Sequence, residues 1–550
     1  MLSNHDRDLT QLHVTDSVSD NAIHNIHVRI LSSVDGDTEV MGNQLVRIAP
    51  SQISPVEHYI QDLNPDLKIR FTKNLGSTRF FKVAKCETDA GPVVVKVFVI
   101  PPSNDVKKQD DPIKDIEKHR LRLKHLRDVL APTYNCLAFC ADILPDGGRA
   151  GFLIRQYGKY SLYDRISTRP FLTNLEKRWL AFQLLLAVEQ CHKRGVCHGD
   201  IKLENILVSS WSWLTLTDFA SFKPTFLPED NPADFSYFFD TSRRWVCYIA
   251  PERFVGRASI TESPSAALPS VPVAEGETSA PGGEAALAQS MDVFSVGCCV
   301  AELFTDGIPV FDFSQLLKYR VGKYEPEEVL SKIEDEDVRA LITHMINKDP
   351  AARLSIEEYL DRERGKVFPE NFYTFLEPYI GMFSKSPPMS SDKKIQKLHK
   401  DLGYLESLLA SEDPGVRIDG GCLVFVTNVV VSCVRSLQLT TSKLACLEVL
   451  GWLAERLTSD LILERLLPQL IHFLSSDVPS VISEAVSVLV TSLGHVTSVP
   501  RSEAKTFPEY ILPVLSPLAK HRCVSVRCAL ARHLASLASL ASRCVLHLEM

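Results

Sequence analysis

The sequence predicts an α+β domain with two lobes, followed by an all-α solenoid of helical repeats. Short segments of alternating apolar residues precede a longer region of helical periodicity, which is typical of a small strand-rich lobe joined to a large helical lobe. Beyond residue 385 the sequence is almost wholly helical and repeats itself. The chain has 550 residues, too many for a single core, so at least two domains are expected.

The strands of the small lobe come first along the chain. Apolar alternation over Phe71–Val83 and Val93–Ile100 predicts two strands, separated by a turn at Asp89–Pro92. A charged helix is expected at Ile113–Leu130. Helical periodicity then predicts the helices of the larger lobe, at Leu175–Arg194, Asp292–Thr305 and Pro326–Lys348.

Changes in composition set the expected domain boundaries. Residues 1–40 are expected to be a disordered extension and residues 41–60 an anchor-like segment. The two-lobed domain is expected over 61–384 and the repeats over 385–550. Residues 256–289 are rich in Ser, Pro, Ala, Gly and Glu, which predicts a flexible insertion within the larger lobe.

The C-terminal repeat has a period near 45 residues. Pro468 in LLPQL and Pro513 in ILPVL lie 45 residues apart, and Val481 and Val526 share the same offset. A weaker copy occupies residues 442–457. A period of this length with two helices per unit is typical of HEAT repeats, with an irregular helical bundle as the alternative.

Bulk composition excludes several classes of protein. The net charge of −8 argues against a nucleic-acid partner. The fourteen cysteines form no CxxC pair, which favours a reduced cytosolic protein over a disulfide framework or a zinc site. No apolar stretch reaches the roughly 18 residues that a membrane-spanning helix needs.

The strongest chemical signal is HGDIKLEN at 198–205. Protein-kinase catalytic loops read H-R-D-L-K-x-x-N, in which Asp accepts the substrate proton, Lys steadies the transferred phosphate and Asn holds magnesium. Asp200, Lys202 and Asn205 take these positions. Asp218 in TDFA is the candidate for a second magnesium ligand, and Lys96 in VVVKVF for the phosphate-contacting lysine on a strand. With A-P-E at Ala250–Glu252, Asp292 with Gly297, and Arg353, these make six motifs in the kinase order, which predict a protein-kinase fold.

The remaining motifs cover the phosphates and brace the large lobe. The phosphate-covering loop is GSTRFFKV, and the residues expected to touch nucleotide there are Leu75, Gly76, Ser77, Thr78 and Val83. Ala250–Glu252 supplies A-P-E, and Asp292 fits a structural position of the large lobe. Glu252 and Arg353 are expected to form a buried ion pair, and Arg243 and Arg244 to be solvated loop charges or, alternatively, docking residues.

The departures from the kinase pattern bear on activity. Thr78 and Phe81 replace two glycines of the phosphate loop, and Phe81 is expected to obstruct or remodel nucleotide access. Gly199 replaces the arginine that would grip a phosphorylated activation loop. Ala220 replaces the glycine of D-F-G and restricts the backbone around Asp218. The partner glutamate of Lys96 is not obvious, and the best candidate is Glu117.

Three functions stay open on the residues alone. The retained side chains suffice to bind ATP or another nucleotide with Mg²⁺, and a working serine/threonine kinase is one interpretation. A regulatory scaffold with a vestigial site is the second, and a nucleotide-sensing switch without turnover is the third. The substitutions at Phe81, Gly199 and Ala220 favour the second and third over the first.

Longer stretches resemble one family, the regulatory subunit of the class III phosphatidylinositol 3-kinase complex, a vacuolar-protein-sorting scaffold kinase. The resemblance covers about residues 41–550 and is carried by MGNQLVRIAPSQI at 41–53, LGSTRFFKVAK at 75–85, LYDRISTRPFL at 162–172, the catalytic and activation segment at 198–254, and FPEYILP at 507–513. It implies a serine/threonine kinase-like domain, HEAT repeats and a C-terminal WD-repeat propeller. The propeller is missing here, and the end at Met550 without a polar capping repeat is expected of a truncated form.

The resemblance also implies partners and a location. These are the lipid-kinase catalytic subunit, a Beclin-type subunit, and the surface of late endosomes and autophagosomes, for a cytoplasmic, peripheral protein in autophagy and vacuolar sorting. Family members begin at the methionine matching Met41 and are myristoylated on the next residue, here Gly42. Because Gly42 is internal, it can be acylated only if translation starts at Met41, and Val46 stands where the motif has Ser or Thr.

Overall fold

The computed structural model describes residues 56–61, 63, 68–77, 81–89, 91–100, 121, 135–136, 141–143, 150–220, 223–240, 242–256, 287–384, 389–413, 416–499 and 505–549. The expected extension 1–40, the myristoylation candidate Gly42 and the helix expected at Ile113–Leu130, apart from Leu121, lie outside the described residues. Most of the expected insertion 256–289 lies outside them too. Its last residues belong to the fold, since Leu287 packs against the core and Gln289 begins a helix.

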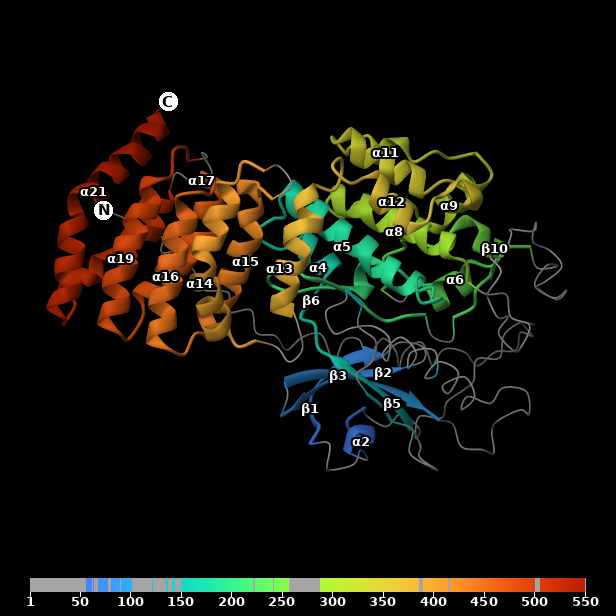
Figure 1. Cartoon of the computed structure of the whole chain (residues 1–550). Coiled ribbons are helices and arrows are strands. Elements are labelled where there is room, and N and C mark those ends of the chain that lie inside the picture. Colours follow the sequence, from blue (N-terminus) through green and yellow to red (C-terminus); the bar gives the residue numbers. More distant parts are fainter. Residues whose placement is uncertain are drawn as a thin grey trace, which may run out of the picture. The chain divides into compact units, whose positions relative to one another are not determined.

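The small lobe is a five-stranded antiparallel sheet in the order β1-β2-β3-β5-β4 (Figure 1). The bounds are β1 Arg70–Ser77, β2 Lys82–Thr88, β3 Gly91–Val99, β4 Ala141–Ile143 and β5 Ala150–Gln156. The expectation of one strand over Phe71–Val83 is wrong, because the chain reverses between Ser77 and Lys82, which pair in register. The strand expected at Val93–Ile100 is confirmed as β3.

The helix α2 (Val56–Gln61) gives the small lobe a core of its own. Val56, Tyr59 and Ile60 are buried in one cluster with side chains of β2, β3 and β5. The strand β1, at the edge of the sheet, is exposed along most of its length. The lobe therefore buries the inner strands, which carry the predicted nucleotide-site residues Val83 and Lys96.

The large lobe is built around α5 (Asn174–His192) and α8 (Gln289–Phe304), as the periodicity predicts. Thr173 begins α5 with a capping box, in which its hydroxyl accepts from the amide of Glu176 and the Glu176 carboxylate accepts from Thr173. The single helix expected over Pro326–Lys348 is wrong. The segment forms α10 (Glu327–Leu330) and α11 (Glu336–Met345), because the Asp335 side chain caps the second helix anew.

Short strands and helices complete this lobe and frame the catalytic motif. The helices are α4 Leu162–Ile166, α6 Pro232–Phe238, α9 Phe313–Arg320 and α12 Ile356–Arg362. The strands are β6 Tyr160–Ser161, β7 Ile206–Val208 and β8 Leu214–Leu216 in one sheet, and β9 Leu227–Pro228 with β10 Phe254–Val255 in another. The motif at 198–205 thus lies between α5 and β7.

The C-terminal segment consists of helices joined by turns and loops, and its described residues form no strand. Its helices are α13 Glu377–Gly381, α14 Ser391–Leu409, α15 Leu423–Cys433, α16 Thr440–Ala454, α17 Ser459–Leu461, α18 Leu467–Leu474, α19 Pro479–Gly494, α20 Leu512–Leu515 and α21 Val524–Glu549. Val481 in α19 and Val526 in α21 are both fully buried, as their shared offset predicts. The all-α repeat prediction is confirmed.

A wide π-helical turn marks the start of three units in this segment. Such turns lie at Phe372–Leu376, Ile462–Leu466 and Thr506–Ile511. Each is followed directly by a helix whose second residue is proline, namely Pro378, Pro468 and Pro513. Proline offers no N–H and crowds the preceding turn, which widens it. We infer that the repeats begin near residue 372, before the predicted boundary at 385.

One buried cluster of apolar side chains extends from α4 in the large lobe to α21. Trp179 of α5 contacts Phe372 and Phe425, with ring centroids 5.2 Å and 5.5 Å away. Beside these rings the Arg465 guanidinium reaches the Glu176 carboxylate, and both side chains are almost fully buried. The large lobe and the first repeats therefore share a core.

Candidate functional site

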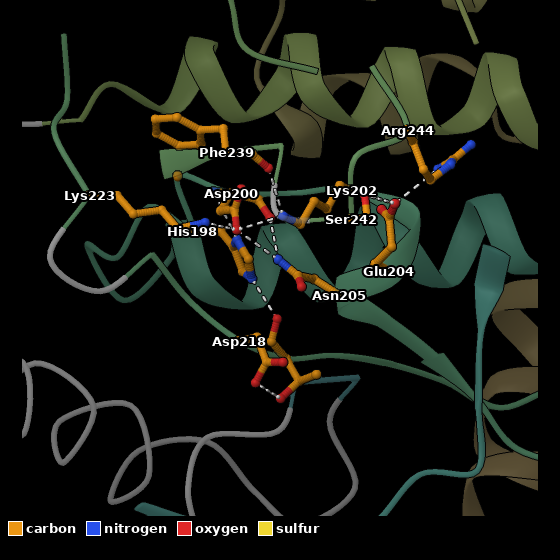
Figure 2. A network of polar contacts seen from close by, with 12 residues as sticks. His198, Asp200, Lys202, Glu204, Asn205, Asp218, Lys223, Phe239, Ser242 and Arg244 are labelled. Atoms are coloured by element: carbon orange, nitrogen blue, oxygen red, sulfur yellow. Dashed lines mark hydrogen bonds and ion pairs between the residues drawn. The ribbon is translucent and has the colours of Figure 1, made fainter. Parts of the chain in front are cut away.

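The catalytic loop is fixed by hydrogen bonds to buried side chains. The Asp292 carboxylate of α8 accepts from the amides of His198 and Gly199, at 2.7 Å and 2.8 Å. The His198 ring accepts from the Asp200 amide at 3.2 Å, and its other nitrogen lies 3.0 Å from the Thr217 carbonyl oxygen. This arrangement sets the positions of the polar side chains in Figure 2.

Asp200, the predicted proton acceptor, is buried among cations. Its Oδ2 accepts from Lys223 Nζ at 2.5 Å and from Asn205 Nδ2 at 3.0 Å, and Lys202 Nζ lies 3.5 Å away. In Figure 2 Lys223 and Lys202 approach the carboxylate from opposite sides. Burial alone would raise the pKa of Asp200, but the charges of Lys202 and Lys223 hold it below its usual value.

Lys223 was missed by the sequence analysis. It lies in the activation segment, and its side chain is 13% exposed. Burial lowers the pKa of Lys223 to about 8, with Asp200 opposing that change and Lys202 adding to it. Lys202, which was predicted, also donates to the Phe239 carbonyl at 3.1 Å. The two lysines therefore tie the catalytic loop to the activation segment.

Asp218, the predicted metal ligand, is held by two cations from the small lobe. Lys96 Nζ on β3 lies 2.7 Å from its Oδ1. Arg155 on β5 donates from Nε to Oδ1 at 3.2 Å and from Nη2 to Oδ2 at 3.3 Å. Asp218 itself adopts a left-handed backbone, with φ +62°. Both carboxylate oxygens of Asp218 therefore accept from positively charged donors.

Arg155 was also missed, although the sequence held a signal for it. It is the single charged residue of β5, where it follows the apolar run AGFLI, and it is 8% exposed. A charge in a buried strand needs a partner of opposite sign. Burial would raise the pKa of Asp218, but Arg155 and Lys96 together hold it far below its usual range.

The predicted nucleotide-loop residues are spread over two strands. Leu75, Gly76 and Ser77 are exposed on β1, Val83 is half-buried on β2, and Thr78 lies outside the described residues. Phe81 is 6% exposed, with its ring 6.1 Å from that of Phe98 and 5.8 Å from Lys96 Nζ. A large ring thus lies close to Lys96, the predicted phosphate-contacting lysine, and the obstruction of nucleotide access stays a prediction. Glu117, the candidate partner of Lys96, lies outside the described residues.

Gly199 and Ala220 lie close together in space. Gly199 has φ +78°, and a Cβ there would lie 2.6 Å from Leu287 Cδ1 and 3.2 Å from Ala220 Cβ. Arg253 donates to the carbonyls of Gly199, Thr225 and Pro224 at 2.8 Å, 2.8 Å and 3.1 Å. A buried arginine therefore holds the activation segment and the catalytic loop through backbone oxygens.

The predictions for three arginines away from the catalytic loop, Arg353, Arg244 and Arg243, have different outcomes. Arg353 forms a bidentate pair with Glu252 at 2.7 Å and 3.0 Å, as predicted. The expectation that Arg244 is solvated is wrong, because it pairs with Glu204 at 3.1 Å and with the buried Glu302. Figure 2 shows the Arg244–Glu204 contact. Arg243 is exposed, as expected.

The fold and the site together define a protein-kinase-like domain joined to helical repeats. The protein kinase domain family matches residues 70–266, and the PIK3R4-like middle domain matches residues 426–549. One match thus lies in the kinase-like part of the chain and the other in the helical repeats, and residues 267–425 lie in neither. Among the described residues, no helix is both long and apolar enough to cross a bilayer.

Three relatives show the family. A serine/threonine-protein kinase VPS15 of Arabidopsis thaliana is 35% identical over 92% of this chain and 38% of its own length. A putative VPS15 kinase of Komagataella pastoris is 35% identical over 86% of this chain and 36% of its own. The Saccharomyces cerevisiae VPS15 is 39% identical over 62% and 22%. The chain belongs to the VPS15 family, and it spans less than two fifths of these relatives.

Proposed function

We propose that the chain is the kinase-like and helical-repeat portion of a regulatory scaffold subunit of the class III phosphatidylinositol 3-kinase complex, acting in autophagy and endosomal or vacuolar sorting. Membership in the VPS15 family supports the assignment of the chain to this complex. The observation that carries the regulatory role is the ion pair between Lys223 and Asp200, at 2.5 Å.

This ion pair opposes phosphotransfer for a chemical reason. A general base must meet the substrate hydroxyl, and its pKa must be high enough to take the proton. Asp200 Oδ2 instead accepts from Lys223 and Asn205, and its lowered pKa makes it a weaker base. We therefore infer that phosphotransfer is weak or absent while Lys223 stays in place.

The arrangement of the site also opposes the expected binding of nucleotide with Mg²⁺. The residue types Lys96, Asn205 and Asp218 are those that protein kinases use for phosphate and magnesium. Their arrangement does not fit the metal, because both oxygens of Asp218 accept from Lys96 and Arg155. Metal binding would require Arg155 to withdraw, so we derive no step through Mg²⁺.

The scaffold role rests on the shared core of the lobe and the repeats. A domain that packs continuously against a helical array presents one extended surface to other proteins. The proposed partners are the lipid-kinase catalytic subunit and a Beclin-type subunit, on late endosome and autophagosome membranes. Membrane attachment through Gly42 requires translation from Met41, and a single acyl chain would still need a second contact.

A working serine/threonine protein kinase is the second candidate. Its support is that the predicted catalytic pair Asp200 and Lys202 and the predicted ligands Asn205 and Asp218 lie close together, with Lys96 in contact with Asp218 (Figure 2 shows all but Lys96). For phosphotransfer, Lys223 and Arg155 would both have to leave their carboxylates.

Reconstitution of the lipid-kinase complex separates the two candidates. Lipid phosphorylation would be measured with the wild-type chain, with Asp200→Asn, and without the chain. We expect activity to be lost without the chain and retained with Asp200→Asn. Loss of activity with Asp200→Asn, in a complex that still assembles, would support the working kinase and overturn the scaffold proposal.

A further inference from the structure

We propose that Cys136 and Cys191 form a reversible disulfide when the chain meets a peroxide, and that this bond fastens the segment before β4 to α5. Cys136 lies in the described segment 135–136, and Cys191 is the last residue but one of α5. Both carry thiols in this structure. The inference concerns a modification site in the fold and does not rest on the proposed function.

The two sulfur atoms already lie close together. Cys136 Sγ is 3.3 Å from Cys191 Sγ, although the two residues are 55 apart in the sequence. The S–S bond of a disulfide is about 2.0 Å long, so the two atoms need to approach by about 1.3 Å. Thiols that are distant in sequence are thus brought together by the fold before any oxidation.

Hydrogen bonds to α5 hold Cys136 in this place. Its thiol donates to the Ala187 carbonyl oxygen at 3.0 Å. The preceding residue, Asn135, donates from its backbone amide to Gln190 Oε1 at 3.0 Å and from its side chain to Gln183 Oε1 at 3.2 Å. Because three contacts join this short segment to one helix, Cys136 stays within reach of the thiol on the same helix.

The two thiols differ in their exposure to solvent. Cys136 is half-buried, whereas Cys191 is fully buried. Thiol oxidation begins at a sulfur that solvent can reach, and it ends in a disulfide where a second thiol lies next to the first. We therefore expect Cys136 to react with the oxidant and Cys191 to react with the oxidised Cys136.

The chemistry proceeds in two steps with hydrogen peroxide as the oxidant. The Cys136 thiolate attacks one peroxide oxygen, the O–O bond breaks, and the departing hydroxide takes up a proton to become water. Cys136 is then a sulfenic acid. The Cys191 sulfur attacks the Cys136 sulfur, the S–S bond forms, and the S–O bond breaks. The hydroxyl group leaves with the proton of Cys191 as a second water, so two thiols are oxidised and one peroxide is reduced.

The bond would form beside a cluster of apolar side chains that joins the two lobes. Cys136 packs against this cluster, whose buried members are Phe81, Phe98, Leu153, Cys191, Val196 and Phe219. A cross-link between residues far apart in sequence restricts the unfolded chain and so stabilises the folded one. We therefore expect the disulfide to stabilise the kinase-like domain where its lobes meet.

Mass spectrometry of the full chain tests whether the bond forms. The reduced chain would be treated with a small molar excess of hydrogen peroxide, alkylated with iodoacetamide and digested with trypsin without reductant. We expect the peptides 128–149 and 179–193 to be linked, with the loss of two hydrogen atoms, and to separate in dithiothreitol. Peptide 128–149 also contains Cys140, so fragment ions and variants must identify the linked cysteine.

Three variants and a thermal measurement complete the test. Cys136→Ser and Cys191→Ala should each abolish the link, whereas Cys528→Ser, at an exposed position of α21, should retain it. Circular dichroism establishes which variants fold. Peroxide should raise the unfolding temperature of the wild-type chain by about 5 °C, as a cross-link over a long loop predicts, and it should not raise that of Cys136→Ser or Cys191→Ala.

Three results would overturn the proposal. One is the absence of the linked peptides, with Cys136 found alkylated or oxidised to a sulfinic acid. Another is a link that folded Cys136→Ser retains, or whose fragment ions place it on Cys140. The third is an oxidised wild-type chain that unfolds at the same temperature as the reduced one. Lipid phosphorylation by the assembled complex does not enter these outcomes, so failure here leaves the scaffold proposal intact.

Discussion

Replacing Arg465 with methionine should destabilise the junction between the large lobe and the repeats. Arg465 donates to both oxygens of Glu176, at 3.0 Å and 2.8 Å, to Asn428 and to the Phe171 carbonyl. The side chains of Arg465 and Glu176 are 3% and 0% exposed. Methionine keeps most of the volume and removes the charge, so Glu176 would be left buried without its cation.

The magnitude follows from that burial. Removing one partner of a buried ion pair destabilises a protein by about 3–5 kcal/mol, because the other charge stays uncompensated. Removing both charges, in Glu176→Gln with Arg465→Met, should be less destabilising than Arg465→Met alone. The interaction energy from the double-mutant cycle should reach roughly 0.5–3 kcal/mol, the range for residues in contact.

Urea unfolding followed by tryptophan fluorescence measures the effect. Trp179 reports on this junction, since its ring lies 5.5 Å from that of Phe425. Lys505→Met is the matched control, because the Lys505–Glu509 pair is 75% and 65% exposed on its two side chains. It should change stability by no more than about 0.5 kcal/mol. A loss below about 1 kcal/mol for Arg465→Met would refute the inference that this pair stabilises the junction.

Three further predictions concern pH and backbone. Burial would raise the folded-state pKa of Glu176, but hydrogen bonds from Arg465, Thr173 and Asn428 and the charge of Arg465 lower it. Ionised Glu176 should therefore contribute to folding stability above its ordinary pKa, and this contribution should disappear as the pH falls through the lower, folded-state pKa. The stability difference between wild type and Glu176→Gln, from urea midpoints, should therefore shrink in acid, and a constant difference would contradict this. Lys223 has a pKa lowered from 10.5 to about 8, so the unfolded chain binds more protons between these values and stability should rise with pH there. Lys223→Met should flatten that rise, and an unchanged slope would argue against a buried charged lysine. Gly199→Arg should destabilise by about 1–3 kcal/mol, because of its left-handed backbone and the contact with Leu287, and thermal unfolding near the wild-type value would exclude that strain.

Elements and residues with local signals could be predicted from the sequence. The helices α5 and α8 were recognised by periodicity, and the repeat by the offset of Pro468 and Pro513. The catalytic-loop residues were found because they all lie within one short motif, at 198–205, in which their spacing is constant. The failure at Pro326–Lys348 was also local in origin, since the side chain of a single aspartate, Asp335, caps a second helix there.

Arg155 and Lys223, which contact the carboxylates of the candidate site, were harder to find, because their partners are distant in sequence. Arg155 and Asp218 are 63 residues apart, and Lys223 and Asp200 are 23 apart. No spacing rule connects such pairs. Arg244 was taken for a solvated charge for the same reason, since its partner Glu302 lies on α8, 58 residues further along the chain. A charged residue in an apolar strand, as at Arg155, is the one signal that could have been used.

Phosphate transfer by the full chain is the most direct test of a regulatory scaffold that does not act as a kinase. Radiolabelled ATP with Mg²⁺ would be supplied to wild type and to Asp200→Asn, and incorporation into the chain and into a general protein substrate would be counted. With Lys223 on Asp200 and Arg155 on Asp218, wild type is predicted to incorporate no more phosphate than Asp200→Asn. Incorporation by wild type well above that of Asp200→Asn, with both proteins folded, would contradict the scaffold proposal and establish a working kinase.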